Sequence, residues 1–327
     1  MPLRNSAKFI CDALDSIINQ SYSNWELIIV DDHSVDDSIG LIEKYQKLHS
    51  QIFWFNNPGK GIIPALKFGF SMAHGKFICR FDSDDKMPKD RLKIMLNKWN
   101  ESSQNKTIVT GQVEYFGKTI SEGYKNYEKW LNQINSDGEQ WPNIYRECVI
   151  ASPNWLMRKQ DLLAIGAFNN LEYPEDYDLV LKCYQAGFQI QYCEETTLYW
   201  REHPDRTSRN SEHYQQRAFF QLKISQFLKF ENKGQKILIW GSTKKGRLSA
   251  NILLEKGYDF IWMDLNPQQF PNGIQGQKVI SYLETSAFNP LETQILLCIY
   301  PENDQKRKIK AYLESLNFLE GKNYWYL

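Results

Sequence analysis

The chain has 327 residues, which is enough for two domains that each have a core of their own. Lysine plus arginine equals aspartate plus glutamate at 39 each, so no net charge attracts nucleic acid and any anionic ligand must be held locally. Apolar runs such as Lys236–Trp240 are far too short to cross a bilayer. Six cysteines without CxxC spacing, and no recognisable signal peptide, predict a cytoplasmic location.

The first two hundred residues alternate apolar β-branched runs with amphipathic helical patterns. Apolar residues at helical spacing predict a helix from Phe9 to Ile18. The runs that follow predict a strand, a helix, a strand, a helix and a strand, at Glu26–Val30, Asp36–His49, Ile52–Phe55, Ile63–Ala73 and Lys76–Phe81. This alternation predicts an α/β fold, with a doubly wound and mostly parallel sheet covered by helices on both faces.

The start of this pattern is unusual, because the first element is a helix for which Asn5 or Ser6 is the expected N-cap. Doubly wound sheets normally place their first strand in the middle of the sheet. We therefore expect the first strand to be missing or truncated. Either the natural protein begins some ten residues upstream or another segment fills the gap.

The pattern continues in the middle of the chain and changes after residue 230. Strands are predicted at Thr107–Tyr115 and Gln189–Trp200, and helices at Tyr124–Ile134, Asp176–Ala186 and Asn210–Phe230. A polar break at Glu231–Gln235 then precedes a second alternating unit, with strands at Lys236–Trp240, Tyr258–Asp264 and Gln294–Tyr300 and helices at Lys245–Lys256 and Gln305–Leu316. These patterns predict a domain over residues 1–230 and a smaller Rossmann-like domain over residues 236–327.

The smaller domain carries only part of a dinucleotide-binding fingerprint. Gly241 and Gly246 match the G-x-G-x-x-G pattern, but Thr243 replaces the middle glycine and its Cβ would crowd a pyrophosphate. Asp264, at the end of the next strand, is placed to face a ribose, yet acidic strand ends are common without ligands. We expect an accessory domain for partner or substrate recruitment rather than a dinucleotide site.

Three acidic clusters stand at the ends of predicted elements. Asp31 and Asp32 follow one strand in VDDHS, Asp82 and Asp84 follow another in RFDSDD, and a third pair opens a helix in YPEDYDL, Glu175 and Asp176. In open α/β sheets ligands bind beyond the carboxyl ends of the strands. Carboxylates that gather at this edge favour the binding of Mg²⁺ or Mn²⁺. Each cluster taken alone is also explained by a structural role in a turn or at a helix N-terminus.

These segments resemble glycosyltransferase family 2, whose members are inverting enzymes of the GT-A fold that use nucleotide-sugar donors. The matching stretches include ALDSIINQSYSNWELIIVDDHSVDDS, GKGIIPALKFGFSMAHGKFICRFDSDD and YPEDYDLVLKCYQAGF, in that order. The resemblance covers nearly two-thirds of the chain, from Met1 to about Arg209. Arg4 departs from it, because the family commonly has a tyrosine there.

The resemblance implies roles for individual residues. Asp31 and Asp32 would bind the donor's base, Asp82 its ribose, and Asp84 the Mn²⁺ or Mg²⁺ ion. Asp176 would be the general base that takes the proton of the acceptor hydroxyl. Three further residues would lie near the phosphates or the acceptor, Glu175, Arg201 and Arg206, and His203 would approach the metal.

The resemblance also implies the cellular setting. It predicts synthesis of a surface polysaccharide or cell-wall glycan by a cytoplasmic protein, from a donor that is UDP-linked by default. The acceptor would be a glycan or a lipid-linked molecule, and peripheral association with the inner face of the membrane is compatible with the sequence.

Two other functions use the same features. A sugar nucleotidyltransferase also displays carboxylates and a metal at strand ends, but it usually carries a glycine-rich basic loop after its first strand, which is not visible here. A non-catalytic binding or scaffold protein on a decayed transferase fold is the other alternative. The presence of both DSDD and the Glu175–Asp176 pair argues against it.

Overall fold

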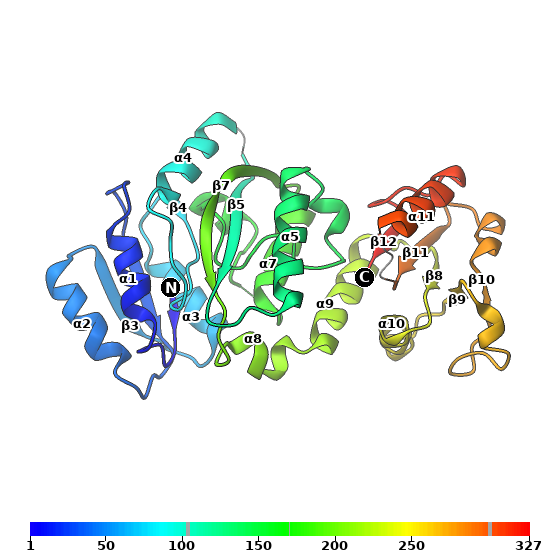
Figure 1. Ribbon diagram of the computed structural model, residues 1–327, viewed down its shortest axis with the longest axis horizontal. Coiled ribbons are helices and arrows are strands. Elements are labelled where there is room, and N and C mark those ends of the chain that lie inside the picture. The colour runs from blue at the N-terminus through cyan, green and yellow to red at the C-terminus, as the bar shows by residue number, and fades with distance from the viewer. Residues whose placement is uncertain (103–104, 170, 300–302) are drawn as a thin grey trace. The chain divides into compact units, whose positions relative to one another are not determined.

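The computed structural model describes residues 1–102, 105–169, 171–299 and 303–327. The chain forms two compact units (Figure 1): Met1–Gln140 with Val149–Asn210, and Trp141–Cys148 with Ser211–Leu327. Helix α9 (Gln216–Phe230), which the sequence placed with the first domain, therefore belongs to the second unit. Within the described residues, no helix combines the length and the apolar character needed to cross a membrane.

The first unit opens with a small parallel sheet in the order β1-β2-β3. Strand β2 (Leu27–Asp31) is buried along its whole length, as expected for the middle strand of a sheet that helices cover. Helix α3 packs on β1 and β2, and α2 packs on β3 and α1. The remaining bounds are β1 (Pro2–Leu3), β3 (Ile52–Asn56), α1 (Ile10–Ile18), α2 (Ser38–Leu48) and α3 (Ile62–Met72).

Two expectations concern the start of the chain. Where we expected the first strand to be missing or truncated, a strand of two residues is present, since Pro2 and Leu3 pair in parallel with Val30 and Asp31. Asn5 is also not an N-cap: it has a left-handed backbone, with φ of 49°, and its Oδ1 accepts a hydrogen bond from the Val35 backbone nitrogen. Helix α1 begins only at Ile10.

The rest of the first unit contains two further pairs of strands. β5 (Thr107–Phe116) runs parallel to β7 (Gln189–Arg201), and β4 (Phe77–Ile78) runs antiparallel to β6 (Met157–Arg158). Strand β4 is much shorter than the predicted Lys76–Phe81, because the chain leaves the extended pairing before the acidic loop begins. The helices of this part are α4 (Arg91–Ser102), α5 (Glu122–Ser136), α6 (Lys159–Ala164), α7 (Glu175–Gln185) and α8 (Thr207–Asn210).

The second unit is built on a five-stranded parallel sheet in the order β10-β9-β8-β11-β12. Its core holds three fully buried tryptophans, Trp240, Trp262 and Trp325. The strands are β8 (Lys236–Trp240), β9 (Ile261–Asp264), β10 (Val279–Ser281), β11 (Thr293–Leu297) and β12 (Tyr324–Tyr326), and the long helices besides α9 are α10 (Lys244–Glu255) and α11 (Asn303–Ser315). Of the predicted strand Gln294–Tyr300, Tyr300 lies outside the described residues.

The turn between β8 and α10 explains the two glycines of the partial fingerprint. Gly241 has φ of 117°, and a Cβ on Gly246 would lie 1.9 Å from the Gly241 carbonyl oxygen. Asp264 Oδ2 accepts hydrogen bonds from the backbone nitrogen of Ser242, at 3.0 Å, and from its hydroxyl. These glycines and this carboxylate thus hold the turn itself together.

Candidate active site

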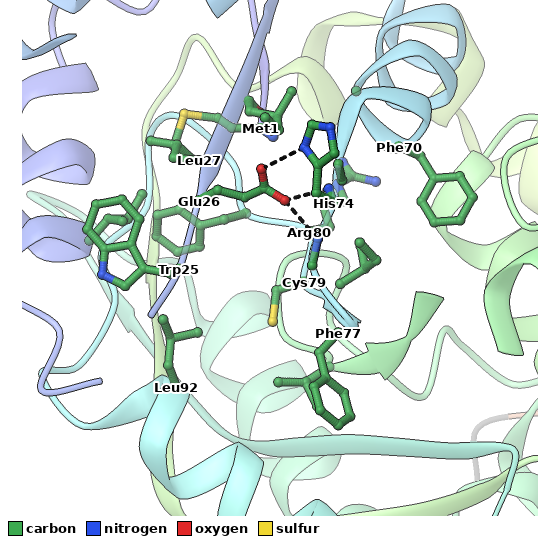
Figure 2. A pocket seen from close by; sticks show the side chains of 18 of the residues that line it. Met1, Trp25, Glu26, Leu27, Phe70, His74, Phe77, Cys79, Arg80 and Leu92 are labelled. Carbon is green, nitrogen blue, oxygen red and sulfur yellow. Dashed lines mark hydrogen bonds and ion pairs between the residues drawn. The ribbon is translucent and has the colours of Figure 1, made fainter. Parts of the chain in front are cut away.

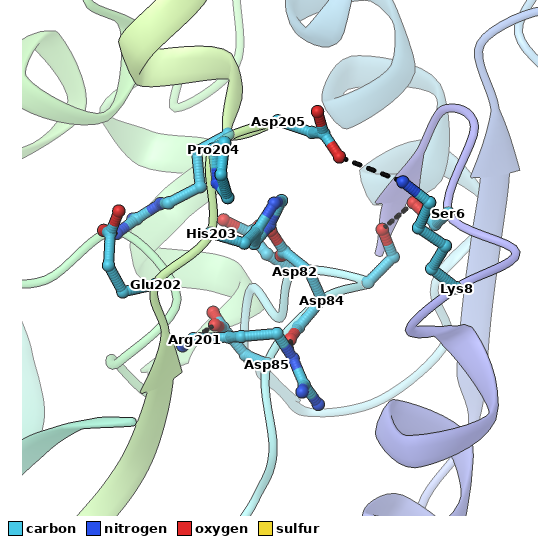
Figure 3. Close-up of polar contacts among 12 residues, drawn as sticks. Ser6, Lys8, Asp82, Asp84, Asp85, Arg201, Glu202, His203, Pro204 and Asp205 are labelled. Carbon is cyan, nitrogen blue, oxygen red and sulfur yellow. Dashed lines mark hydrogen bonds and ion pairs between the residues drawn. The ribbon is translucent and has the colours of Figure 1, made fainter. Parts of the chain in front are cut away.

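Three loops of the first unit meet around the acidic segment that follows β4 (Figure 3). Ser6, in the loop after β1, shares a hydrogen bond of 2.6 Å with Ser83. Lys8, in the same loop, pairs with Asp205 at 3.2 Å. The third link joins His203, beyond the end of β7, to Asp84. Residues from three distant parts of the sequence are thereby brought to one place.

Asp84 and His203 face one another directly. His203 Nε2 lies 2.8 Å from Asp84 Oδ2, and the two side chains keep 12% and 25% of their exposure, respectively. The Phe9 ring packs against the imidazole at a centroid distance of 4.5 Å. The structure thus brings these two predicted site residues together.

Arg80 joins two of the acidic clusters. Its Nε donates to Asp82 Oδ1 at 2.9 Å, and its Nη1 donates to Glu175 Oε1 at 3.0 Å. Arg80 and Glu175 are both buried, with side-chain exposures of 7% and 1%. A buried carboxylate is tolerated when a cation with matched hydrogen bonds faces it. The acidic loop and the start of α7 are therefore held together by one guanidinium.

Asp176, the next residue of α7, has an altered acidity. Burial raises the pKa of its carboxyl to about 6, and the negative charge of Glu175 adds to this effect, while Arg80 opposes it. Its Oδ1 accepts a hydrogen bond of 2.8 Å from the backbone nitrogen of Tyr177. A carboxyl with a pKa near neutrality is suited to accept a proton during a reaction.

Asp31 and Asp32 end β2 in different ways. Asp31 accepts from the Ser34 backbone nitrogen at 3.1 Å and so closes a local turn. Asp32 Oδ1 accepts from Asn57 Nδ2 at 2.7 Å and from the Gly61 nitrogen at 2.8 Å, and its Oδ2 lies 3.5 Å from an Arg4 guanidinium nitrogen. Asp32 thus lies at a turn lined by β2, β3 and α3, while Asp31 faces its own loop.

Arg201 and Arg206 are engaged with protein groups. Arg201 donates to the Asp84 carbonyl oxygen and to Asp12 Oδ2, and its guanidinium stacks 4.5 Å from the Phe116 ring centroid. Arg206 donates to buried Glu202 at 3.1 Å and lies over the Trp200 ring. Both arginines lie beside the acidic loop, but the structure directs them toward protein partners.

A divalent cation is compatible with the Asp84–His203 pair. Mg²⁺ and Mn²⁺ accept carboxylate and phosphate oxygens, and they commonly take only one or two protein carboxylates beside the phosphates of a substrate. Among the described residues, no group of three or more His, Cys, Asp or Glu side chains is arranged to hold a metal by itself. Asp84 and His203 could therefore supply two ligands to such a cation, and its other ligands would have to come from outside the described residues.

Sequence reasoning missed Arg80 and Asn57. Arg80 was visible as a single arginine within the otherwise apolar stretch Phe77–Phe81, directly before the acidic loop, a place where a cation is usually paired. Asn57 gave no comparable signal, since an asparagine after a strand is ordinarily a turn residue. Its contact with Asp32 depends on the adjacency of β2 and β3.

Comparison with known proteins identifies what the chain is similar to. The family described as "Glycosyl transferase family 2" matches residues 1–166, half of the chain. "Probable glycosyltransferase YdaM" of Bacillus subtilis is 24% identical over 212 residues, which are 63% of this chain and 50% of that protein. An uncharacterized glycosyltransferase of Rickettsia prowazekii is 25% identical over 88% of this chain and 86% of its own length.

Solved structures show the same fold. S. aureus TarS 1-349 in complex with UDP-GlcNAc superposes with a TM-score of 0.55 at 19% identity, over 71% of this chain and 66% of that one. The chain spans about half the length of the B. subtilis relative and 39% of the longer TarS chain. The predicted α/β fold of the GT-A type is thereby confirmed.

Proposed function

We propose that this chain, which belongs to glycosyl transferase family 2, is a metal-dependent inverting glycosyltransferase that moves a sugar from a nucleotide-sugar donor to an acceptor hydroxyl. The observation that carries this proposal is the Arg80 contact with both Asp82 and Glu175, which brings the acidic loop beside Asp176. A carboxyl with a pKa of about 6 then lies next to carboxylates suited to a cation and a donor.

The donor's diphosphate is assigned to the loop that contains Asp84. Asp84 and His203 would hold Mn²⁺ or Mg²⁺, and Asp82 would lie nearer the ribose. When bound, the cation supplies a Lewis acid that neutralises charge on the departing diphosphate. Asp32 is assigned to the base, where a carboxylate accepts from a ring N–H, and uridine is the preferred base because TarS 1-349 was solved with UDP-GlcNAc. Asp31 is assigned a supporting role at the same turn.

Asp176 is assigned to the acceptor. Its carboxylate takes the proton of the attacking hydroxyl, the new bond forms at the anomeric carbon, and the nucleoside diphosphate leaves from the opposite face with inversion. Glu175 and Arg80 position Asp176 rather than react, since they are buried and bound to one another. Arg201 and Arg206 are assigned to the support of the acidic loop.

The acceptor is proposed to be a glycan or a lipid-linked molecule, with the protein in the cytoplasm or peripherally at the inner face of the membrane. The role is proposed to be the synthesis of a cell-wall or surface polysaccharide, and the second unit, which contains α9, is assigned to partner or substrate recruitment. No nucleic acid takes part in this scheme, in keeping with the balanced charge of the chain.

Release of nucleoside diphosphate from a panel of nucleotide sugars tests the proposal, with Mn²⁺ and with EDTA. We expect release from at least one donor that requires Mn²⁺, is lost in Asp84→Ala and is retained in Asp137→Asn, a change at an exposed site in α5's C-cap. Inorganic pyrophosphate formed from a nucleoside triphosphate and a sugar phosphate would instead identify a nucleotidyltransferase. A protein that binds the donor but releases no nucleoside diphosphate, whichever acceptor is added, would be identified as a binding protein.

A further inference from the structure

An exposed ion pair joins two of the loops that meet at the acidic segment (Figure 3). Lys8 Nζ lies 3.2 Å from Asp205 Oδ2, and the two side chains keep 75% and 67% of their exposure, respectively. We propose that Lys8 binds the diphosphate of the donor: its ammonium leaves Asp205 when the donor binds and then contacts phosphate oxygens. This inference rests on the proposed function. Lys8 is then a binding residue, and Asp205 is the group that holds its ammonium in the free protein.

The first observation is the position of the ion pair. Lys8 is followed by Phe9, whose ring packs against the His203 imidazole at a centroid distance of 4.5 Å. Asp205 comes two positions after His203, which faces Asp84. The pair therefore lies beside the two residues that are assigned to the cation. A diphosphate bound to that cation would be close to the Lys8 ammonium, which is carried on a flexible four-carbon stem.

The second observation is that the arginines around the acidic loop are bound to protein groups. Arg80, Arg201 and Arg206 are largely buried, and each donates to a carboxylate of the protein. If Arg80 or Arg206 turned to a ligand, buried Glu175 or Glu202 would lose a cation, and an uncompensated buried charge is costly. The diphosphate therefore needs positive charge from another residue, in addition to the charge of the metal ion.

The third observation is that the Lys8–Asp205 pair is easily exchanged. An ion pair between two exposed side chains contributes little to stability, because water screens it. Arg4 in the same loop is also exposed, but its partner Asp32 is nearly buried. A diphosphate offers more negative charge than one carboxylate, and lysine binds phosphate as a point charge. The negative charge also grows as the bond to the sugar breaks, so an ammonium placed there stabilises the departing group.

A cavity of about 640 Å³ beside β2 is a separate place and does not compete for the diphosphate (Figure 2). Most of its lining is apolar, and the charged side chains labelled in Figure 2 are bound to protein groups. Glu26 Oε1 accepts from the Gly75 nitrogen at 2.8 Å and Oε2 lies 3.2 Å from His74 Nδ1, contacts that are drawn there as dashed lines. Arg80 holds the acidic loop. Neither Lys8 nor a residue of the acidic loop lines this cavity.

The test compares Lys8→Met, Asp205→Asn and the double variant with the wild type, each as the full chain. Calorimetry with Mn²⁺ measures the binding of UDP, GDP, ADP and CDP, and ligand-observed NMR measures the corresponding nucleosides. We expect Lys8→Met to weaken nucleoside diphosphate binding by about tenfold or more, the usual effect of a lost hydrogen bond to a charged group, and to leave nucleoside binding unchanged. Asp205→Asn should strengthen nucleoside diphosphate binding by about two- to fivefold, because its carboxylate no longer competes for the ammonium. The double variant should bind like Lys8→Met.

Two further sets of variants serve as controls. Lys8→Arg keeps a cation at this position and should retain most of the affinity for nucleoside diphosphates. Lys98→Met and Glu101→Gln remove the partners of another exposed ion pair, 3.5 Å long, in α4. Neither of these two changes should alter the binding of a nucleoside diphosphate or of a nucleoside.

Several outcomes would overturn the proposal. If Lys8→Met and Asp205→Asn both weaken binding, the pair is a structural link between two loops. If Asp205→Asn strengthens binding equally with and without Lys8, Asp205 repels the diphosphate directly and no exchange takes place. Unchanged affinity in Lys8→Met would overturn this inference alone, whereas a wild type that binds no nucleoside diphosphate would overturn the proposed function as well.

Discussion

Arg80 Nη1 and Glu175 Oε1 are 3.0 Å apart although 95 positions of sequence separate the two residues. Both side chains are buried, and the same guanidinium also holds Asp82 through its Nε. Removing one partner of a buried ion pair leaves an uncompensated charge and costs about 3–5 kcal/mol. The contact therefore contributes to the stability of the first unit and ties the acidic loop to the start of α7.

Two replacements of Arg80 distinguish the effect of its positive charge from the effect of its hydrogen-bonding geometry. We expect Arg80→Met to lower Tm and to abolish turnover. We expect Arg80→Lys to keep the fold but to lose most turnover, because an ammonium group lacks the planar set of N–H donors with which the guanidinium bonds Asp82 and Glu175 at the same time. Arg307→Met is the matched control, since Arg307 is 84% exposed and its ion pair with exposed Asp304 is 3.8 Å long. Wild-type turnover in Arg80→Lys would show that the planar guanidinium group has no positioning role.

Replacement of the proposed base should affect chemistry more than binding. We expect Asp176→Asn to lower kcat by about 10²–10⁴-fold, the usual contribution of a positioned base, with donor affinity retained. Steady-state kinetics and calorimetric titration of the donor measure the two effects separately. Unchanged kcat would remove Asp176 from the mechanism.

The raised pKa of Asp176 gives a pH dependence with a definite sign. A base acts when deprotonated, so kcat/KM should rise with pH through about 6 and level off above it, provided that Glu175, Asp82 and Arg80 keep their present arrangement. Between the ordinary pKa of 3.8 and about 6 the unfolded chain loses this proton before the folded one, so the folded state loses stability as pH rises through that window.

The amide side chain in the Asp176→Asn variant does not ionise between pH 3.8 and about 6. Its Tm should consequently exceed that of the wild type at pH 7.5 by more than it does at pH 4. A Tm difference that is the same at both pH values would contradict the raised pKa.

The metal prediction rests on Asp84 and His203. We expect Asp84→Ala to abolish the Mn²⁺-dependent part of donor binding, and His203→Ala to weaken it less, because a hard cation prefers the carboxylate oxygen. Calorimetry with Mn²⁺ and with EDTA measures this difference, and Asp90→Ala, at an exposed site just after the acidic loop, is the control. Equal donor binding with and without Mn²⁺ in the wild type would make the proposed cation unnecessary.

The second unit should not bind a dinucleotide tightly. Thr243 places a Cβ where a pyrophosphate would approach, and Asp264 Oδ2 already accepts from Ser242. Titration of the full chain with NADH or NADPH, followed by fluorescence, should therefore show no saturation at micromolar concentrations. Saturable binding that Asp264→Asn removes would establish a dinucleotide site.

Much of the architecture followed from local pattern. β2, β3, α3 and β8 lie where apolar periodicity placed them, because each is a continuous run with clear ends. The helix predicted over 210–230 is instead broken: Ser211 caps a short 3-10 turn at Glu212–Tyr214 before α9 begins. Strand β12 was not predicted, since its three residues are stabilised by pairing with β11 rather than by any periodicity of their own.

The acidic residues of the site could be named from sequence, but their connections could not. Asp82 and Glu175 are distant in sequence, and only tertiary packing brings Arg80 between them. The same holds for Asp32, whose neighbours Asn57 and Gly61 both come from the segment between β3 and α3. Local patterns report residue type and periodicity, whereas these contacts depend on which strands are adjacent.

The loop after β1 connects two positions that are assigned to the donor. It contains Arg4, which faces Asp32, and Ser6, which bonds to Ser83. Because Pro2 and Leu3 pair with β2, one end of this loop is already anchored before a donor binds. The loop therefore has less conformational freedom to lose on binding, and this lowers the entropic cost of ordering it.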